Sequence, residues 1–91
     1  MPMIYIADDE ENIRTIVSIG LQDGGFETAC FPDGASLLKA VRRHRPDAVI
    51  LDWMMPQPDG IAVCRALREN GETHSIPIPM LTVRGEEMDR V

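Results

Sequence analysis

Short apolar runs alternate with amphipathic segments along most of the chain. The runs are typical of buried strands, and the segments between them repeat apolar residues at helical spacing. Four strands are predicted, over residues 3–7, 26–30, 48–51 and 76–83. Strands that alternate with helices form parallel sheets with right-handed connections and helices on both faces. The sequence therefore predicts an α/β fold, in which ligands bind beyond the carboxyl ends of the strands.

Three helices are predicted between the strands. The first ends at the glycines of residues 24–25, and the second begins after Asp33 and ends before Pro46. The third begins near Asp59 and ends at Gly71. The residues expected to face inward are Ile13, Ile16, Val17, Gly20 and Leu21 in the first helix, Leu37, Leu38 and Val41 in the second, and Ile61, Cys64 and Leu67 in the third.

Composition limits the classes of protein to which the chain can belong. It has 91 residues, enough for one small domain, and 44% of them are hydrophobic, which is typical of a soluble globular protein. The net charge is -6, and the one basic cluster, residues 42–45, is short. We therefore expect no direct contact with nucleic acid through this segment, because binding the phosphate backbone requires many positive charges. The cluster is predicted to be a solvated helix end.

The histidines, the cysteines and the N-terminal residues give no sign of a zinc site or of export. His44 and His74 lack a second histidine or a cysteine at ligand spacing, so both are expected to be solvated. Cys30 and Cys64 form no CxxC pattern and are expected to be small core residues with reduced thiols. The sequence has no signal peptide and no transmembrane segment, which favours a cytoplasmic location without membrane contact.

Three carboxylates lie where predicted strands end. Asp8 and Asp9 follow the first strand, and Asp52 follows the third. Carboxylates gathered at the edge of an apolar core repel one another and lose hydration, so such a group usually binds a cation or performs chemistry. Alternatively, Asp8, Asp9 and Glu10 are ordinary acids at the start of a helix, where the positive end of the helix dipole favours negative charge. Thr82, near the end of the fourth strand, would join the group if that strand lies beside the third.

Three sequence blocks, ADDEEN around the acidic pair, LDWMMPQPDG around Asp52 and IPMLTVRGEEMDRV around Thr82, resemble the response-regulator receiver domain. The resemblance runs from Met3 to the last residue. It implies a flavodoxin-like doubly wound parallel sheet with strand order 2-1-3-4, in which the family's fifth strand and last helix are missing. Residues 1–91 are therefore expected to form one receiver domain that is incomplete at its C-terminus.

The resemblance also implies a signalling function without enzymatic turnover. A partner histidine kinase would transfer a phosphoryl group to Asp52, the phosphoacceptor. A magnesium ion would be held by Asp9, Asp52 and the backbone carbonyl of Met54, with Asp8 acting directly or through water, because magnesium prefers hard oxygen ligands. The hydroxyl of Thr82 would then bond the phosphoryl group and switch a surface that an output domain or partner protein recognises.

Two departures from the family keep other functions open. In the family, a phosphoryl-binding lysine and an aromatic switch residue lie on the fifth strand, and neither is present in this sequence. Their absence favours an alternative, an interaction module without phosphate turnover. A phosphatase with an aspartate nucleophile is less favoured, because it needs a second acid where Met54 stands. The fourth strand would be an exposed edge on which Pro77 and Pro79 weaken pairing, with a local irregularity at Pro79. Such an edge makes a dimer possible.

Overall fold

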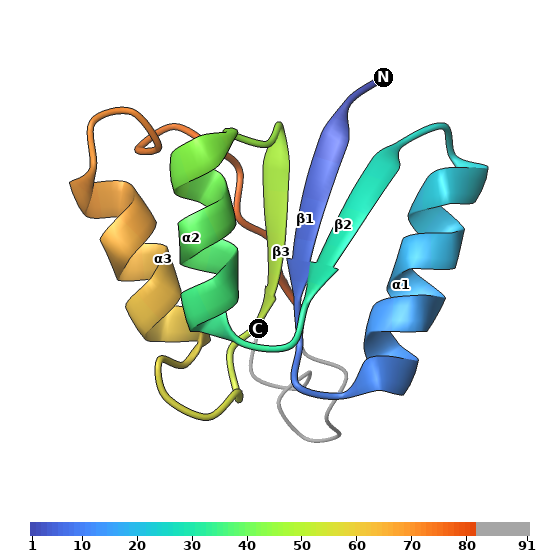
Figure 1. Ribbon diagram of the computed structural model, residues 1–91, viewed down its shortest axis with the longest axis horizontal. Helices are drawn as coiled ribbons and strands as arrows, with labels where there is room; N and C mark the ends of the chain where they lie inside the picture. Colours follow the sequence, from blue (N-terminus) through green and yellow to red (C-terminus); the bar gives the residue numbers. More distant parts are fainter. Residues whose placement is uncertain (82–91) are drawn as a thin grey trace.

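The predicted alternation of strands and helices is present in the computed structural model, which describes residues 1–81. The chain enters the fold through a strand, and each of the first three strands is followed by a helix (Figure 1). The elements are β1 (Met3–Ala7), α1 (Glu11–Asp23), β2 (Glu27–Phe31), α2 (Gly34–Arg43), β3 (Ala48–Asp52), α3 (Gly60–Glu69) and β4 (Met80–Leu81). The predicted Thr82 switch lies outside the described residues.

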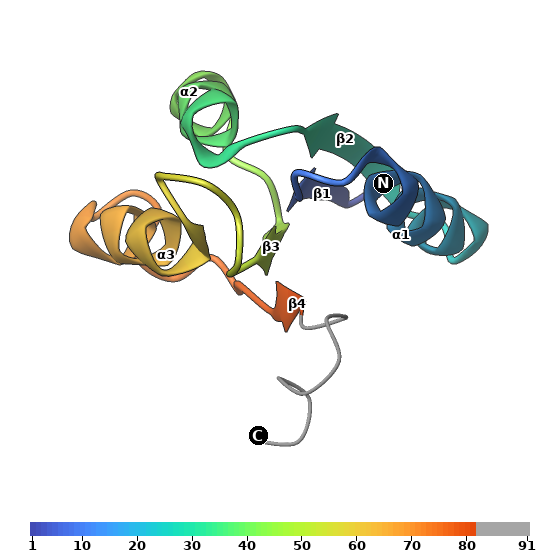
Figure 2. The same ribbon diagram turned by 90° about the horizontal axis from the view of Figure 1, so that it is seen from below.

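The strands form one parallel sheet in the order β2-β1-β3-β4, which confirms the predicted order. Helix α1 covers one face of the sheet, and α2 and α3 cover the other (Figure 2). Strand β1 lies between β2 and β3, and Ala7 pairs with both Phe31 and Leu51. The carboxyl ends of these strands therefore meet at one edge of the sheet. None of the helices in the described part of the chain has the length and hydrophobicity that a bilayer crossing requires.

Side chains of β1 alternate between the two faces, as strand geometry requires. Tyr5 and Ala7 belong to the main core beneath α2 and α3, whereas Ile4 and Ile6 are buried outside that cluster. The other buried members of the main core are Leu37, Val41, Val49, Leu51, Met55, Val63, Leu67 and Ile76. Strand β1 is thus buried on both faces, whereas on β3 Val49 and Leu51 are buried and Ile50, on the other face, is half-buried.

The starts of α2 and α3 and the end of α1 follow the predicted signals. The Asp33 side chain accepts a hydrogen bond from the Ser36 backbone N–H at 2.8 Å, and Asp59 accepts one from Ala62 N–H at 2.9 Å. These caps satisfy N–H groups that have no partner within the helix. After α1 the chain turns at Gly25, where φ is 93°. Glycine adopts this left-handed conformation without steric cost, so it ends the helix here.

Several inward-facing predictions are wrong. Ile16 is 66% exposed and Ile61 is 48% exposed. Helix α1 contacts the sheet through a narrower arc than predicted, and Gly20 is also exposed. The buried line of α3 runs through Gly60, Val63 and Leu67, and its centre lies about 130° from Ile61 at 3.6 residues per turn.

Two further predictions need correction. Cys30 is exposed rather than buried in the core, because it lies on β2, an edge strand that only α1 covers on that face. Cys64 is half-buried, and both cysteines are free thiols. Helix α3 ends at Glu69, two residues before the predicted stop at Gly71, and the Asn70 side chain accepts a hydrogen bond from Glu72 N–H.

The fourth strand is much shorter than the predicted 76–83, because two prolines interrupt its ladder. The carbonyls of Pro77 and Pro79 accept hydrogen bonds from Val49 N–H and Leu51 N–H at 3.0 and 3.2 Å. Neither proline has an N–H to donate back to the carbonyls of β3, so regular pairing starts only at Met80. The expected irregularity at Pro79 is therefore confirmed.

Candidate metal centre

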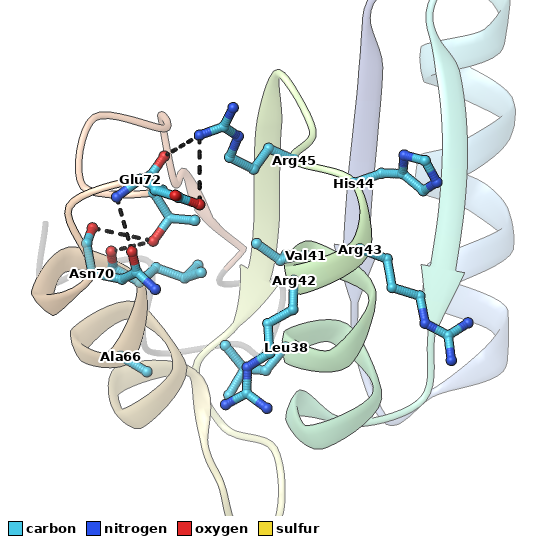
Figure 3. A pocket seen from close by; sticks show the side chains of 11 residues that line it. Leu38, Val41, Arg42, Arg43, His44, Arg45, Ala66, Asn70 and Glu72 are labelled. Atoms are coloured by element: carbon cyan, nitrogen blue, oxygen red, sulfur yellow. Dashed lines mark hydrogen bonds and ion pairs between the residues drawn. The ribbon is translucent and has the colours of Figure 1, made fainter.

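A groove of about 530 Å³ lies between α2 and α3 near the amino end of β3, and its lining includes the basic cluster. Arg45 is close to Glu72, with 3.8 Å between Nη1 and Oε1, and the two side chains are 56% and 81% exposed. Figure 3 shows that Arg42, Arg43 and Arg45 extend in different directions. The guanidinium groups do not converge on one point, so the groove lacks the arrangement of an anion site. Residues 42–45 are exposed, so the prediction that this basic cluster is a solvated helix end is confirmed.

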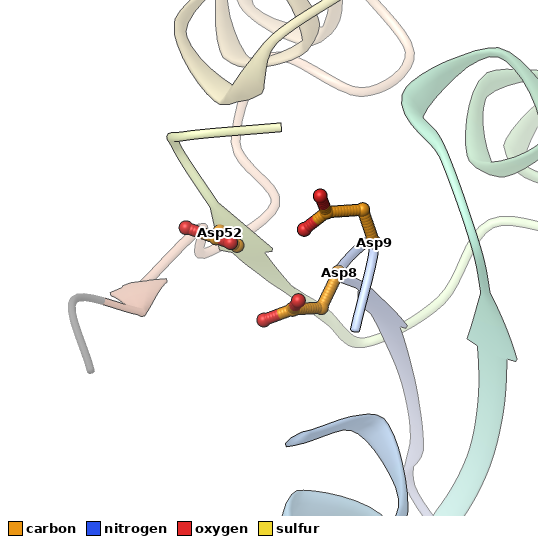
Figure 4. Close-up of side chains that lie close together, drawn as sticks. All are labelled: Asp8, Asp9 and Asp52. Atoms are coloured by element: carbon orange, nitrogen blue, oxygen red, sulfur yellow. The ribbon is translucent and has the colours of Figure 1, made fainter. Parts of the chain in front are cut away.

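The predicted acids do converge, at the opposite edge of the sheet. Asp8 follows the last residue of β1, and Asp52 is the last residue of β3. Because Ala7 pairs with Leu51, the next residue of each strand emerges at the same level. Asp9 follows Asp8 as the chain turns toward α1. Figure 4 shows the three carboxylates gathered in one place.

The geometry of this cluster is tight, and two of its members are buried. One carboxylate oxygen from each of Asp8, Asp9 and Asp52 lies within 4.8 Å of the other two. Asp8 and Asp52 have no exposed surface, whereas Asp9 is exposed. Acids that only decorate a helix N-terminus stay hydrated, because burying a carboxylate costs on the order of several kcal/mol. Burial of two of the three acids therefore favours a site over surface decoration.

Asp8 is fixed by bonds from three segments. Its N–H donates to the Phe31 carbonyl at 3.2 Å, which extends the pairing with β2 by one residue. Its carboxylate Oδ1 accepts from Glu10 N–H at 2.8 Å. Its carbonyl accepts from Arg14 Nη1 at 2.6 Å. Backbone and side chain are both held, so Asp8 presents its carboxylate in one orientation.

Asp52 is fixed from the loop and helix that follow it. Its Oδ1 accepts a hydrogen bond from Met54 N–H at 3.1 Å. Gly60, the first residue of α3, packs against the peptide that joins Asp52 to Trp53. A Cβ at this position would lie 2.8 Å from the Asp52 carbonyl oxygen and would overlap Trp53 Cα. Only glycine allows α3 to approach the end of β3 so closely.

The donor set suits magnesium. Oxygens around magnesium at about 2.1 Å are about 3.0 Å apart when adjacent and about 4.2 Å when opposite. Separations within 4.8 Å need only small adjustments to meet these values. Carboxylate ligands are hard, so they favour magnesium, calcium or manganese over softer metals. Three acids would leave coordination positions for water or phosphoryl oxygens.

The structure thus brings together the three acids that the sequence singled out. The N–H of Met54 is bonded to Asp52, which puts the backbone of that residue beside the cluster. Residues Arg14 and Gly60 were missed. For Arg14 a signal was available, because a cation in the first turn of a helix opposes the helix dipole and needs another reason to be there. His44 and His74 are exposed, as predicted.

The chain matches a known protein family. Residues 4–91 match the family described as the response regulator receiver domain. The chain is 41% identical over 91 residues to the phosphate regulon transcriptional regulatory protein PhoB of Rhizobium meliloti (strain 1021), covering all of this chain and 40% of that protein. It is 42% identical over 88 residues to the DNA-binding response regulator MtrA of Mycolicibacterium smegmatis (strain ATCC 700084 / mc(2)155), covering 97% and 37%. The chain spans about two fifths of these relatives.

Solved structures share the fold. The chemotaxis response regulator CheY4 of Vibrio cholerae has a TM-score of 0.88 at 32% identity, over 99% of this chain and 75% of that one. A chain in the crystal structure of the histidine kinase ThkA with the response regulator protein TrrA has a TM-score of 0.82 at 34% identity, over 91% of this chain and 70% of that one. The flavodoxin-like fold predicted from the sequence is confirmed.

Proposed function

This chain belongs to the response regulator receiver domain family, and we propose that it accepts a phosphoryl group from a histidine kinase on Asp52, beside a magnesium ion held by Asp8, Asp9 and Asp52. One observation carries the proposal. Carboxylates from two neighbouring strands converge within 4.8 Å, and two of them are fully buried. The family relationship supports the choice of Asp52 among the three acids, because it ends the apolar run in the block that resembles the family's phosphoacceptor segment.

The proposed reaction transfers phosphorus between two side chains. A carboxylate oxygen of Asp52 attacks the phosphorus of a phosphohistidine on the kinase, and the bond from phosphorus to the ring nitrogen breaks. The nitrogen leaves with the electron pair, and Asp52 becomes an acyl phosphate. Such transfers depend mainly on positioning and on stabilising charge. The hydrogen bond from Met54 N–H supports this role by fixing the orientation of the Asp52 carboxylate.

Magnesium would neutralise charge and orient the phosphoryl oxygens. Two unit charges 4 Å apart repel by about 1 kcal/mol in water and by about 4 kcal/mol at an effective dielectric constant of 20. Three carboxylates and an incoming phosphate would therefore repel strongly at a site that is partly buried. Asp8 and Asp9 offset this repulsion by holding the cation, and the backbone carbonyl of Met54 is proposed as a further ligand.

Signal output is proposed to follow from Thr82. Its hydroxyl would bond the new phosphoryl group and move the segment that follows, which changes a surface for an output domain or partner protein. The relatives that match this chain include proteins named as transcriptional regulatory and DNA-binding. We therefore propose that the output acts on DNA through a region other than this receiver domain.

A phosphorylation assay tests the proposal. The protein is incubated with magnesium and a small phosphodonor such as phosphoramidate, and its intact mass is measured. We expect a mass increase of one phosphoryl group that hydroxylamine removes, as it does for acyl phosphates. Asp52→Asn keeps the shape of the side chain and should abolish the adduct.

Two variants serve as controls. Asp9→Asn removes a proposed metal ligand but not the acceptor, so it should slow phosphorylation and raise the magnesium concentration that is needed. Asp23→Asn changes an exposed acid at the end of α1 and should leave both quantities unchanged. An adduct that persists in Asp52→Asn would assign the acceptor to another residue, and a folded wild-type protein without any adduct would refute the phosphoacceptor function.

A further inference from the structure

Arg14 holds the segment that carries both first-strand acids. It is the fourth residue of α1, at the end of the first turn, is half-buried and donates from Nη1 to the backbone carbonyl of Asp8 at 2.6 Å. We propose that Arg14 is a positioning residue for the metal centre, which acts through the peptide that joins Asp8 to Asp9. This inference rests on the proposed magnesium site and adds a residue that does not itself bind the ion.

The planar peptide bond between Asp8 and Asp9 transmits the effect of Arg14. The carbonyl of Asp8 and the N–H of Asp9 belong to one rigid unit, so fixing the carbonyl fixes the direction in which the chain leaves toward Asp9. On the other side of Asp8, its N–H is tied to the carbonyl of Phe31 at 3.2 Å. Strand β1 ends at Ala7, one residue before this point. Arg14 supplies the donor for the Asp8 carbonyl.

The place of Arg14 in the helix supports a specific role. The first turn of a helix carries a partial positive charge, so a cation there is unfavourable by a few tenths of a kcal/mol or more. The bond to a half-buried carbonyl compensates, because hydrogen bonds from charged donors are stronger than neutral ones. The main chain of Arg14 is itself held in place by two bonds. Its N–H donates to the Glu10 carbonyl at 3.1 Å, and its carbonyl accepts from Cys30 Sγ at 3.9 Å.

Arg14 affects magnesium binding in two opposite ways, and salt separates them. Its positive charge repels the cation, so removing it strengthens binding at low ionic strength. Its bond to Asp8 holds the ligands in place, so removing it weakens binding at any ionic strength. Charge effects between solvated groups are largely screened at 1 M salt, where the Debye length is about 3 Å. Positioning is not screened.

Magnesium titrations of three variants test the inference, with Trp53 fluorescence as the signal because Trp53 adjoins Asp52. At high salt we expect Arg14→Ala to raise the magnesium Kd about tenfold, the lower end for loss of groups that orient metal ligands. Arg14→Lys keeps one charged donor, and the observed bond uses a single nitrogen, so it should recover most of the affinity. Arg65→Ala removes an exposed arginine from α3 and should match the wild-type protein.

A second measurement needs no metal. In metal-free protein we expect the backbone amides of Asp9 and Glu10 to exchange with solvent about tenfold faster in Arg14→Ala than in Arg65→Ala, as loss of a charged hydrogen bond implies. Unchanged exchange, or a change in affinity that disappears at high salt, would overturn the positioning role. If wild-type protein binds no magnesium while the exchange difference is present, the proposed metal site fails and the positioning of the acidic segment stands.

Discussion

Within residues 1–81, the two edges of the sheet carry opposite charges, and the charged side chains converge at only one of them. At the carboxyl edge, Asp8, Asp9 and Asp52 bring oxygens within 4.8 Å of one another, and two of the side chains are buried. At the amino edge, Arg42 and Arg45 line a wide groove, but both are exposed and extend apart (Figure 3). Charge density in the sequence is similar at the two places. What differs is whether neighbouring strands force the side chains to converge.

Helix polarity explains why each sign lies where it does. In a parallel α/β fold, helices begin at the carboxyl edge and end at the amino edge. The positive ends of the helix dipoles therefore meet the acids, and Asp33 and Asp59 cap α2 and α3 at that edge. The negative ends meet Arg42 and Arg43 in the last turn of α2. Dipole complementarity is enough to account for the arginines, whereas it does not account for the buried acids.

The largest effect is expected where α3 approaches the acidic edge. Gly60→Ala places a Cβ against the Asp52–Trp53 backbone, and overpacking of this kind costs about 2–3 kcal/mol. The free energy of unfolding in urea measures it. Gly71→Ala is the control near the other edge, because no atom lies within 4 Å of its Cβ, and its effect should stay within about 0.5 kcal/mol. Equal effects at the two glycines would remove the special role of the contact at Gly60.

Magnesium should stabilise the protein through the acidic edge alone. At a free concentration about one hundred times Kd, binding to the folded state adds about 2.7 kcal/mol to the free energy of unfolding. Asp52→Asn should lose most of this increment, whereas Arg42→Gln at the amino edge should keep it. Urea denaturation with and without magnesium gives both values. A similar loss in the two variants would mean that magnesium acts through the whole molecule and not through the acids.

A smaller, pH-dependent effect is expected at the start of α2. Two hydrogen bonds lower the pKa of Asp33 below its ordinary value of 3.8. The larger effect comes from the Ser36 N–H and the smaller one from the Ser36 hydroxyl. The cap is therefore fully stabilising above pH 3.8 and is lost as pH falls through the lower pKa of the folded state. Asp33→Ala should lower the free energy of unfolding by about 1 kcal/mol at neutral pH, and by less at a pH below the folded-state pKa of Asp33.

Urea denaturation from about pH 7 to about pH 2.5 tests this sign. The difference between wild type and Asp33→Ala should shrink on acidification. A difference that grows toward low pH would contradict the assignment of Asp33 as a capping carboxylate.

The same comparison shows what sequence reasoning could predict. The acids were found because each follows an apolar run, and parallel topology then requires their strands to end at one edge. Helix caps were found because Asp33 and Asp59 precede apolar periodicity. Long-range packing was harder to predict. The exposure of Ile61 depends on which arc of α3 meets the sheet, and the role of Gly60 depends on how closely α3 approaches β3. Neither is a local property of the sequence.

The smallest effect is expected at the ion pair of the amino edge. Arg45 and Glu72 are 3.8 Å apart with side chains 56% and 81% exposed, and such pairs contribute about 0.5 kcal/mol or less. Arg45→Gln should therefore change the free energy of unfolding by no more than that, and the change should vanish in about 1 M salt. A double-mutant cycle with Glu72→Gln isolates the pair. A coupling energy above about 1 kcal/mol that salt does not reduce would show that the groove is more rigid than its exposure implies. The contrast between ordered acids at the carboxyl edge and solvated arginines at the amino edge would then need revision.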